Sequence, residues 1–142
     1  MFRSLEKKYM KKDRLIEFKV LGDHRGKLIA LESSREVPFD FKRVFYIYGT
    51  QEGIPRGDHS HYKTKQFLVA VHGSCKVTLD NGKGKETFYL NKPNVGLFQD
   101  ALIWGTMHDF SKDCVLMVLA DEYYDPSDYI TNYDIFLELV VK

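Results

Sequence analysis

The chain has 142 residues, of which 44% are apolar, and a net charge of +1. This length suits one domain with a hydrophobic core, and the apolar fraction excludes a disordered chain. The balanced charge gives no basis for binding nucleic acid or an anionic membrane. No apolar stretch resembles a signal peptide or approaches the roughly 20 residues that span a bilayer. We expect a single cytoplasmic domain over residues 1–142, with a charged, irregular segment over residues 1–14.

Short strands between turn-forming residues dominate the predicted secondary structure. The first half of the chain predicts strands over residues 15–21, 27–32 and 42–48. The second half predicts strands over residues 67–71, 75–79, 86–90, 95–98, 101–104 and 114–120. Many short strands separated by Gly, Pro, Asn and Asp turns predict an antiparallel β-sandwich or barrel.

Local patterns add detail to these strands. Alternation over residues 42–48 assigns the side chains to two faces, with Val44, Tyr46 and Tyr48 opposite Arg43, Phe45 and Ile47. Residues 67–71 are apolar on both faces, which predicts a central strand. Asn81-Gly82 predicts a hairpin turn. Cys75 and Cys114 lie in apolar runs, which is typical of buried thiols rather than of a disulfide.

The C-terminal segment differs from the rest of the chain. Residues 125–128 resemble the start of a helix, because an aspartate can cap it and carboxylates stand near its positive end. Residues 129–141 predict one or two short helices. The apolar side chains of this segment need a covering surface, which predicts a dimer.

A polar stretch over residues 56–66 carries the clearest chemical signal. His59 and His61 stand at positions i and i+2, so both imidazoles share one face of an extended strand. Imidazole titrates near neutral pH, and a pair of imidazoles suits proton transfer or metal ligation. Arg56 beside the pair suits an anion such as phosphate. The alternative is a structural pair that is hydrogen-bonded at the end of a strand.

The same stretch resembles the first motif of the cupin superfamily. The match is carried by Gly57, His59, His61, Gln66 and Gly73. In cupins, two histidines and a glutamate five residues later usually hold a metal on a jelly roll, but here Gln66 takes the glutamate position. A neutral amide is a poorer ligand for a divalent cation, and the pattern expected around a later histidine is absent at His108. We therefore expect no metal, which leaves the histidines free to move protons.

Longer motifs narrow the resemblance to the dTDP-4-keto-6-deoxyglucose 3,4-ketoisomerases. These motifs read FDFKRVFYI, PRGDHSH, VHGSC, MHDF and EYYDPSDYITNYD. With their neighbours they run from about residue 15 to about residue 136, nearly the whole chain. The resemblance implies an all-β, cupin-type jelly-roll β-sandwich with a short C-terminal helical tail. It also implies a metal-independent enzyme that is usually a homodimer.

The resemblance implies a substrate and a reaction. Such enzymes move the ketone of a dTDP-linked 4-keto-6-deoxyhexose from C4 to C3, and the product is aminated for surface glycans or antibiotic sugars. A base removes the C3 proton, an enediol forms, and a proton returns to C4, so no cofactor is expected. We assign the base to His59, with His61 orienting the substrate or sharing the proton. Arginines suit the diphosphate, and aromatic rings suit thymine or the sugar. The expected substrate-binding residues are Arg25, Arg43, Tyr46, Arg56, Gln66, Trp104 and His108.

Three positions depart from the family pattern. Phe45 stands where a tyrosine is common, so a hydroxyl is missing from a proton relay. Asp58 replaces an aromatic residue before the first histidine, and Gly105 stands where histidine or arginine is usual. Arg25 resembles the galacto-forming members, whereas Gly105 fits neither stereochemical type.

Two other functions stay open from the sequence. A cupin that binds a nucleotide sugar without turning it over is kept open by Phe45 and Gly105. A metal-dependent cupin enzyme is disfavoured by Gln66.

Overall fold

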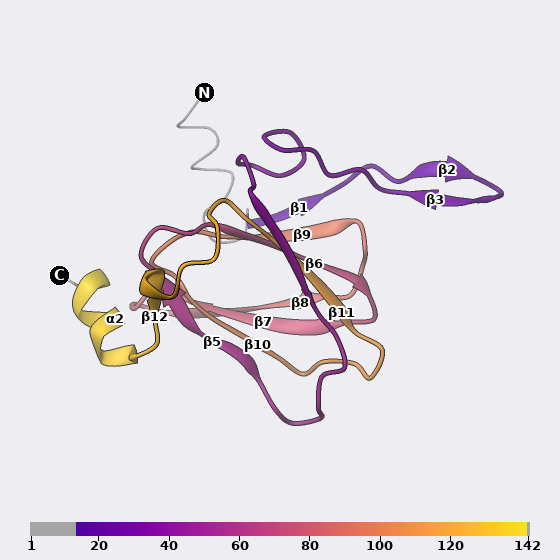
Figure 1. The fold of residues 1–142 in the computed structure, drawn as a ribbon. Coiled ribbons are helices and arrows are strands. Elements are labelled where there is room, and N and C mark those ends of the chain that lie inside the picture. Colours follow the sequence, from indigo (N-terminus) through magenta and orange to yellow (C-terminus); the bar gives the residue numbers. More distant parts are fainter. Residues whose placement is uncertain (1–13, 142) are drawn as a thin grey trace.

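A computed structural model describes residues 14–141, which form two packed antiparallel sheets, a protruding hairpin and a short C-terminal helix (Figure 1). The strands are β1 (Leu15–Glu17), β2 (Leu21–Asp23), β3 (Gly26–Leu28), β4 (Arg43–Ile47), β5 (Arg56–His61), β6 (Gln66–His72), β7 (Cys75–Asp80), β8 (Lys85–Leu90), β9 (Val95–Gln99), β10 (Trp104–His108), β11 (Val115–Ala120) and β12 (Tyr129–Ile130). The 3-10 helix η2 (Pro126–Asp128) precedes β12, and helix α2 (Tyr133–Val140) follows it. The predicted jelly-roll sandwich with a helical tail is confirmed. Apart from Arg14, the segment predicted to be irregular lies outside the described residues.

Two five-stranded sheets enclose the main core. The first sheet has the strand order β1-β9-β6-β11-β4, and the second sheet has the order β12-β5-β10-β7-β8. The core between them consists of almost fully buried side chains that include Leu68, Val77, Leu97, Leu116 and Val118. We call the sheet surfaces that meet here the inner faces. Because side chains alternate along a strand, each sheet also has an outer face that needs its own covering.

The outer face of the first sheet is covered by a segment without strand pairing. Residues 29–41 cross this face and pack Val37 and Phe39 against side chains that include Phe67 and Leu119. Strand β6 is therefore buried on both faces at the centre of its sheet, as its continuous apolar run predicts. The crossing segment corrects the prediction of a strand over residues 27–32, because strand pairing ends at Leu28.

Two other predicted strands differ in the structure. Residues 15–21 divide into β1 and β2, because the buried Phe18 leaves the sheet and donates its N–H to Asn94 O at 2.7 Å. The second difference lies at residues 101–104, where Leu102 has a φ of 59° and donates its N–H to His61 O at 2.9 Å. That turn delays the strand, so β10 begins only at Trp104.

Turn and cap residues behave largely as the sequence predicts. The hairpin at Asn81-Gly82 joins β7 to β8, although it is a four-residue loop in which Asn81 Oδ1 accepts the N–H groups of Lys83 and Gly84. At the C-terminal end, Asn132 caps α2 by accepting the N–H of Ile135 at 3.1 Å. Residues 129–130, predicted as helix, instead add β12 to the second sheet.

Helix α2 packs against one end of the outer face of the second sheet, beside β12 (Figure 1). Trp104, Ile130 and Phe136 are buried between the helix and the sheet. The chain therefore covers part of its own apolar tail, which weakens the tail as a reason for dimerisation. Cys75 and Cys114 are buried and free, as predicted, and burial raises the pKa of the Cys75 thiol to about 12. Within residues 14–141, no helix is both long and apolar enough to cross a bilayer.

Candidate active site

The two histidines of β5 form an aromatic cluster with a tyrosine from the neighbouring strand. Their ring centroids lie 5.0 Å apart, and the rings meet edge to face. Tyr129 pairs with His61 in the sheet, and its ring centroid lies 4.4 Å from that of His61 and 4.9 Å from that of His59. Residues that pair directly across strands point to the same face. The predicted spacing therefore does bring both imidazoles together, with a phenol beside them.

Burial keeps both imidazoles neutral at pH 7. The pKa of His61 is lowered to about 4, first by burial and then by the charges of His59 and Arg43, against the opposing effect of Asp128. The pKa of His59 is also lowered by burial, while a hydrogen bond with the Gly57 backbone and the charge of Asp58 oppose this shift. A neutral imidazole can accept a proton, so each of these groups can act as a base.

Two buried nitrogen atoms at this site have no hydrogen-bond partner among the described residues. They are Nε2 of His61 and Nε of Arg43. Arg43 lies on β4 of the first sheet, with its guanidinium 5.3 Å from the ring centroid of Phe45 and 5.7 Å from that of Tyr124. Buried polar atoms are normally satisfied, so unpaired ones beside reactive groups indicate a place for a polar ligand.

The first sheet contributes a row of polar side chains at the same end of the core. Strand pairing aligns Arg43 with Ala120, Ala120 with Gln66, and Gln66 with Gln99. Leu68 and Leu97, two positions further along β6 and β9, belong to the main core, so the row lies on the inner face. Gln66 and Gln99 are buried, at 8% and 5% exposed. One end of the sandwich interior is thus polar, whereas the rest is apolar.

Asp128 holds the end of the histidine strand in place. Its carboxylate is 4% exposed and accepts the backbone N–H groups of Lys63 and Thr64 at 2.9 and 3.2 Å, together with the Thr64 hydroxyl. Its backbone carbonyl accepts the N–H of Tyr62. These bonds fix the turn after His61 to the segment that carries Tyr129.

Five of the predicted site residues share the inner faces of the two sheets. His59 and His61 belong to the second sheet, and Arg43 and Gln66 belong to the first. Arg56 pairs with Met107, which packs against the main core, so its exposed side chain starts from the same face.

The other four predicted residues lie elsewhere in the chain. Tyr46 projects from the outer face of the first sheet and is 63% exposed. Trp104 and His108 lie on the outer face of the second sheet, where Trp104 packs under α2 and His108 Nε2 lies 2.7 Å from Thr78 Oγ1. Arg25 lies at the turn between β2 and β3, where it forms a 2.7 Å ion pair with Asp23. Within one chain, these four side chains therefore lie away from the histidine pair.

Comparison with known proteins identifies the family. Residues 11–141 match the family described as FdtA: WxcM-like, C-terminal. The chain belongs to this family. It is 47% identical over 130 residues to the TDP-4-oxo-6-deoxy-alpha-D-glucose-3,4-oxoisomerase of Aneurinibacillus thermoaerophilus, covering 92% of this chain and 94% of that one.

Solved structures of 3,4-ketoisomerases have the same fold. A mutant of the enzyme from Thermoanaerobacterium thermosaccharolyticum, in complex with TDP-4-keto-6-deoxyglucose, superposes with a TM-score of 0.86 at 44% identity, covering 89% of this chain and 91% of that chain. A 3,4-ketoisomerase from Helicobacter canadensis gives 0.87 at 41% identity, covering 90% and 96%. The predicted family is confirmed, and the FdtA-family chain is an isomerase.

Sequence reasoning missed three residues of this FdtA-family site. Tyr129 and Asp128 belong to the tail motif that carries the resemblance, but nothing local to the sequence places them beside β5. Gln99 precedes a predicted strand and carries no motif signal at all. Its one distinguishing feature in the sequence is its place directly after the apolar strand predicted over residues 95–98.

The donor set around the histidines suits metal binding poorly. Gln66 lies on the inner face of the first sheet with its neutral amide. Within residues 14–141, no group of three or more His, Cys, Asp or Glu side chains is placed to hold a metal ion. The absence of a metal stays a prediction from the ligand chemistry.

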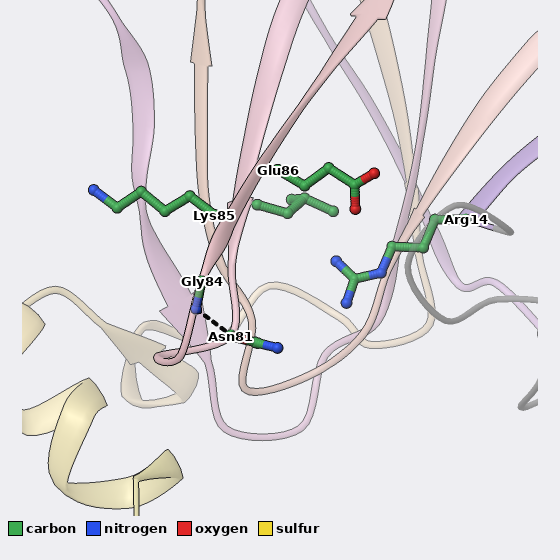
Figure 2. Close-up of a pocket in the computed structure, with 6 residues that line it drawn as sticks. Arg14, Asn81, Gly84, Lys85 and Glu86 are labelled. Carbon is green, nitrogen blue, oxygen red and sulfur yellow. Dashed lines mark hydrogen bonds between the residues drawn. The ribbon is translucent and has the colours of Figure 1, made fainter.

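A cavity of about 180 Å³ lies at the far edge of the second sheet (Figure 2). Its lining includes Arg14, Asn81, Lys85 and Glu86, and in Figure 2 Lys85 points away from Arg14 and Glu86. Burial lowers the pKa of Arg14, while the charge of Glu86 opposes this shift. The lining of this cavity contains no imidazole, unlike the histidine cluster on the inner face of the second sheet.

Proposed function

We propose that this protein moves the ketone of a dTDP-linked 4-keto-6-deoxyhexose from C4 to C3, with His59 as the base. The observation that carries this proposal is the pair of neutral imidazoles on the inner face, beside an unpaired guanidinium nitrogen. The substrates in the names of the most similar relatives support the choice of sugar.

The reaction balances with proton transfers alone. The C4 ketone acidifies the proton on C3, and His59 removes it to leave an enediolate. The hydroxyl proton on the C3 oxygen then passes to the C4 oxyanion, directly or through a protonated imidazole. The electrons form the C3 carbonyl as the proton taken from C3 is delivered to C4, so the product carries a C3 ketone and a C4 hydroxyl. One carbon is oxidised as its neighbour is reduced, so the reaction requires no external redox partner. A positioned general base contributes about 10²–10⁴-fold to such a step.

His61 has a different role in this scheme. It is more deeply buried than His59, and its pKa of about 4 makes it a weaker base. We assign it to orienting the substrate and to sharing the proton on the enediol oxygen, through its unpaired Nε2. Tyr129, which packs against both rings, can donate a hydrogen bond from its phenol.

The diphosphate requires cations near the imidazoles. Arg43 and Arg56 start from the inner faces of opposite sheets, and an arginine fork matches a phosphate oxygen pair. Arg25 belongs to a hairpin that projects from its own sandwich (Figure 1). We propose that the protein is a homodimer, in which this hairpin packs against the second copy.

One experiment decides between the open functions. Purified protein is mixed with dTDP-4-keto-6-deoxyglucose, and NMR follows the sugar over time. Conversion to the 3-keto isomer is expected, and the coupling constants of the product show its configuration at C4. Binding without conversion contradicts the proposal and favours a binding module. Loss of conversion after a bound stoichiometric metal is removed favours a metal-dependent cupin enzyme.

The 3-keto product is a suitable substrate for a subsequent amination. A ketone at C3 is the group that an aminotransferase converts to an amine. We therefore propose that the enzyme supplies a pathway to a dTDP-linked 3-amino-3,6-dideoxyhexose for a surface glycan. An assay coupled to such an aminotransferase tests this step, and amination at C4 in place of C3 contradicts it.

A further inference from the structure

The residue before the catalytic histidine occupies a β-bulge. Gly105 pairs with His59, and the next residue of β10, Thr106, pairs with Gly57, so Asp58 is the extra residue. Gly57 and Asp58 both have positive φ angles, of 78° and 61°. A bulge changes the direction of the side chains that follow it. The conformation of these two residues therefore sets the direction in which the His59 imidazole leaves the strand.

The Asp58 carboxylate ties this bulge to the strand beside it. Its Oδ1 accepts the indole N–H of Trp104 at 2.9 Å and the hydroxyl of Thr106 at 3.3 Å. Both partners lie on the outer face, opposite to the imidazoles, where Asp58 also lines a hollow of about 330 Å³. The Asp58 side chain thus anchors the bulge through hydrogen bonds on the outer face.

The indole is a rigid donor. Trp104 is 7% exposed, and its ring centroid lies 5.1 Å from that of Tyr133 and 5.5 Å from that of Phe136. Both neighbours belong to α2, so the C-terminal helix holds the indole against the sheet. A functional group is positioned best when the residues behind it are locked by packing.

Two interactions connect the bulge to the imidazole. The Gly57 backbone forms a hydrogen bond with His59, and the charge of Asp58 acts on the same ring. The other groups beside His59 are His61 and Tyr129. If the bulge relaxes, the hydrogen bond between the His59 ring and the Gly57 backbone changes with it.

We propose that Asp58 is a positioning residue whose hydrogen bond to the Trp104 indole holds the bulge in the conformation that aims His59 at the reacting carbon. This role rests on the proposed function, because it takes His59 as the base. If the Asp58 carboxylate only accepted the indole N–H and did not position His59, its removal would affect stability but not the turnover of the folded protein.

Three variants separate the hydrogen bond from the backbone requirement. Asp58→Asn keeps an oxygen acceptor and tolerates the positive φ, whereas Asp58→Gly keeps only the φ. Trp104→Phe removes the donor and retains most of the ring packing. We expect kcat to fall about 10- to 100-fold in Asp58→Gly and Trp104→Phe, with KM little changed. The double variant should be no slower than the slower single variant, and Asp58→Asn should stay close to wild type.

A matched control comes from the residue that follows β10. Asp109 also has a positive φ, of 52°, and its carboxylate lies 2.8 Å from a ring nitrogen of His108 on the outer face. Asp109→Gly makes the same backbone change away from His59, and we expect unchanged kcat. A wild-type kcat in folded Asp58→Gly or Trp104→Phe overturns the proposal. Additive losses, or an Asp58→Asn as slow as Asp58→Gly, also overturn it.

A second measurement does not depend on turnover. Nitrogen NMR of the free protein reports the tautomer of each imidazole. We expect one dominant His59 tautomer in the wild type and in Asp58→Asn, and a mixture in Asp58→Gly. An unchanged His59 imidazole in Asp58→Gly overturns the positioning role. If the wild type shows no turnover while Asp58→Gly still alters the His59 imidazole, the proposed reaction fails and the positioning role stands.

Discussion

The side-chain amide of Gln99 occupies the space that a side chain at Gly105 would fill. A Cβ built at Gly105 would lie 2.5 Å from Gln99 Nε2 and 2.9 Å from its Oε1. The two residues come from opposite sheets, and Gly105 pairs directly with His59. A neutral amide from the first sheet therefore takes the place that a β10 side chain would have at the strand partner of His59.

This relationship predicts that Gly105→Ala destabilises the fold through Gln99 alone. The new methyl must displace the buried amide and break its 3.2 Å hydrogen bond from Nε2 to Ile103 O, at a cost of about 1 kcal/mol. Chemical denaturation measures the cost. In a Gln99→Ala background, the same substitution should cost almost nothing. Gly84→Ala is the control, because apart from its two chain neighbours no described residue has an atom within 4 Å of a Cβ at this position. Equal costs in both backgrounds contradict the prediction.

His59→Asn should lower turnover by about 10²–10⁴-fold while the protein stays folded and still binds dTDP. Binding is retained because the diphosphate contacts are assigned to the arginines. Exchange of the C3 proton with deuterated water should fall in step, since the same group makes the enediol. His72→Asn is a matched control, with a side chain that is 68% exposed near Asp113. If C3 exchange in His59→Asn continues at the wild-type rate, His61 becomes the better candidate for the base.

Arg56→Ala should raise KM more than it lowers kcat. The side chain starts from the face that carries His59, and losing a charged hydrogen bond to a ligand costs about 1.5–3 kcal/mol. Steady-state kinetics and dTDP titration measure the two effects. Arg35→Ala, which removes a 73% exposed arginine from the segment that crosses the first sheet, should change neither. An unchanged KM in Arg56→Ala removes this residue from the phosphate site.

Stability should fall as the pH drops from 7.5 to 5. The pKa of His61 is lowered from 6.5 to about 4 on folding, so between these values the unfolded chain binds a proton that the folded chain does not. Acid therefore favours unfolding, by about 2 kcal/mol at pH 5 from this group. Thermal melts across this range measure the effect. His61→Gln should flatten the dependence, and an unchanged slope in that variant would mean that His61 is not the group responsible.

The protein should have the mass of a dimer in light scattering at micromolar concentration. Within the described residues, β2 and β3 pair only with each other, and Leu21 and Leu28 on this hairpin are 43% and 56% exposed. Leu28→Asp should shift the mass toward a monomer. Tyr89→Asp, at an equally exposed position on β8, should not. A monomeric wild type would contradict the dimer.

Local sequence patterns predicted the features that depend on alternation alone. The i, i+2 spacing put both imidazoles on one face, and the two-sided apolar run of residues 67–71 became the central strand β6. The same rule correctly separated the inner side chain of Arg43 from the outward Tyr46. These predictions hold because the period of a strand comes from the backbone itself.

The positions of other side chains depend on contacts with distant parts of the chain, which local sequence patterns do not reveal. Trp104 was assigned to the substrate site, but β10 begins there only because the preceding turn bonds to His61 O, and this register turns the indole to the outer face. Tyr129 reaches the imidazoles only because a strand predicted as helix pairs with β5. No local sequence pattern indicates the hydrogen bond from this turn to His61 O or the pairing of β12 with β5.

By itself, the sequence determined the all-β class, the paired histidines and the family. The tertiary structure decided that Tyr129 from the tail meets the imidazoles, and that Gln99 from the opposite sheet lies against Gly105, the strand partner of His59. The physical reason is that alternation is a property of one strand, whereas a site between two sheets depends on register. A shift of one residue, or a single bulge such as that at Asp58, exchanges the inner and outer faces.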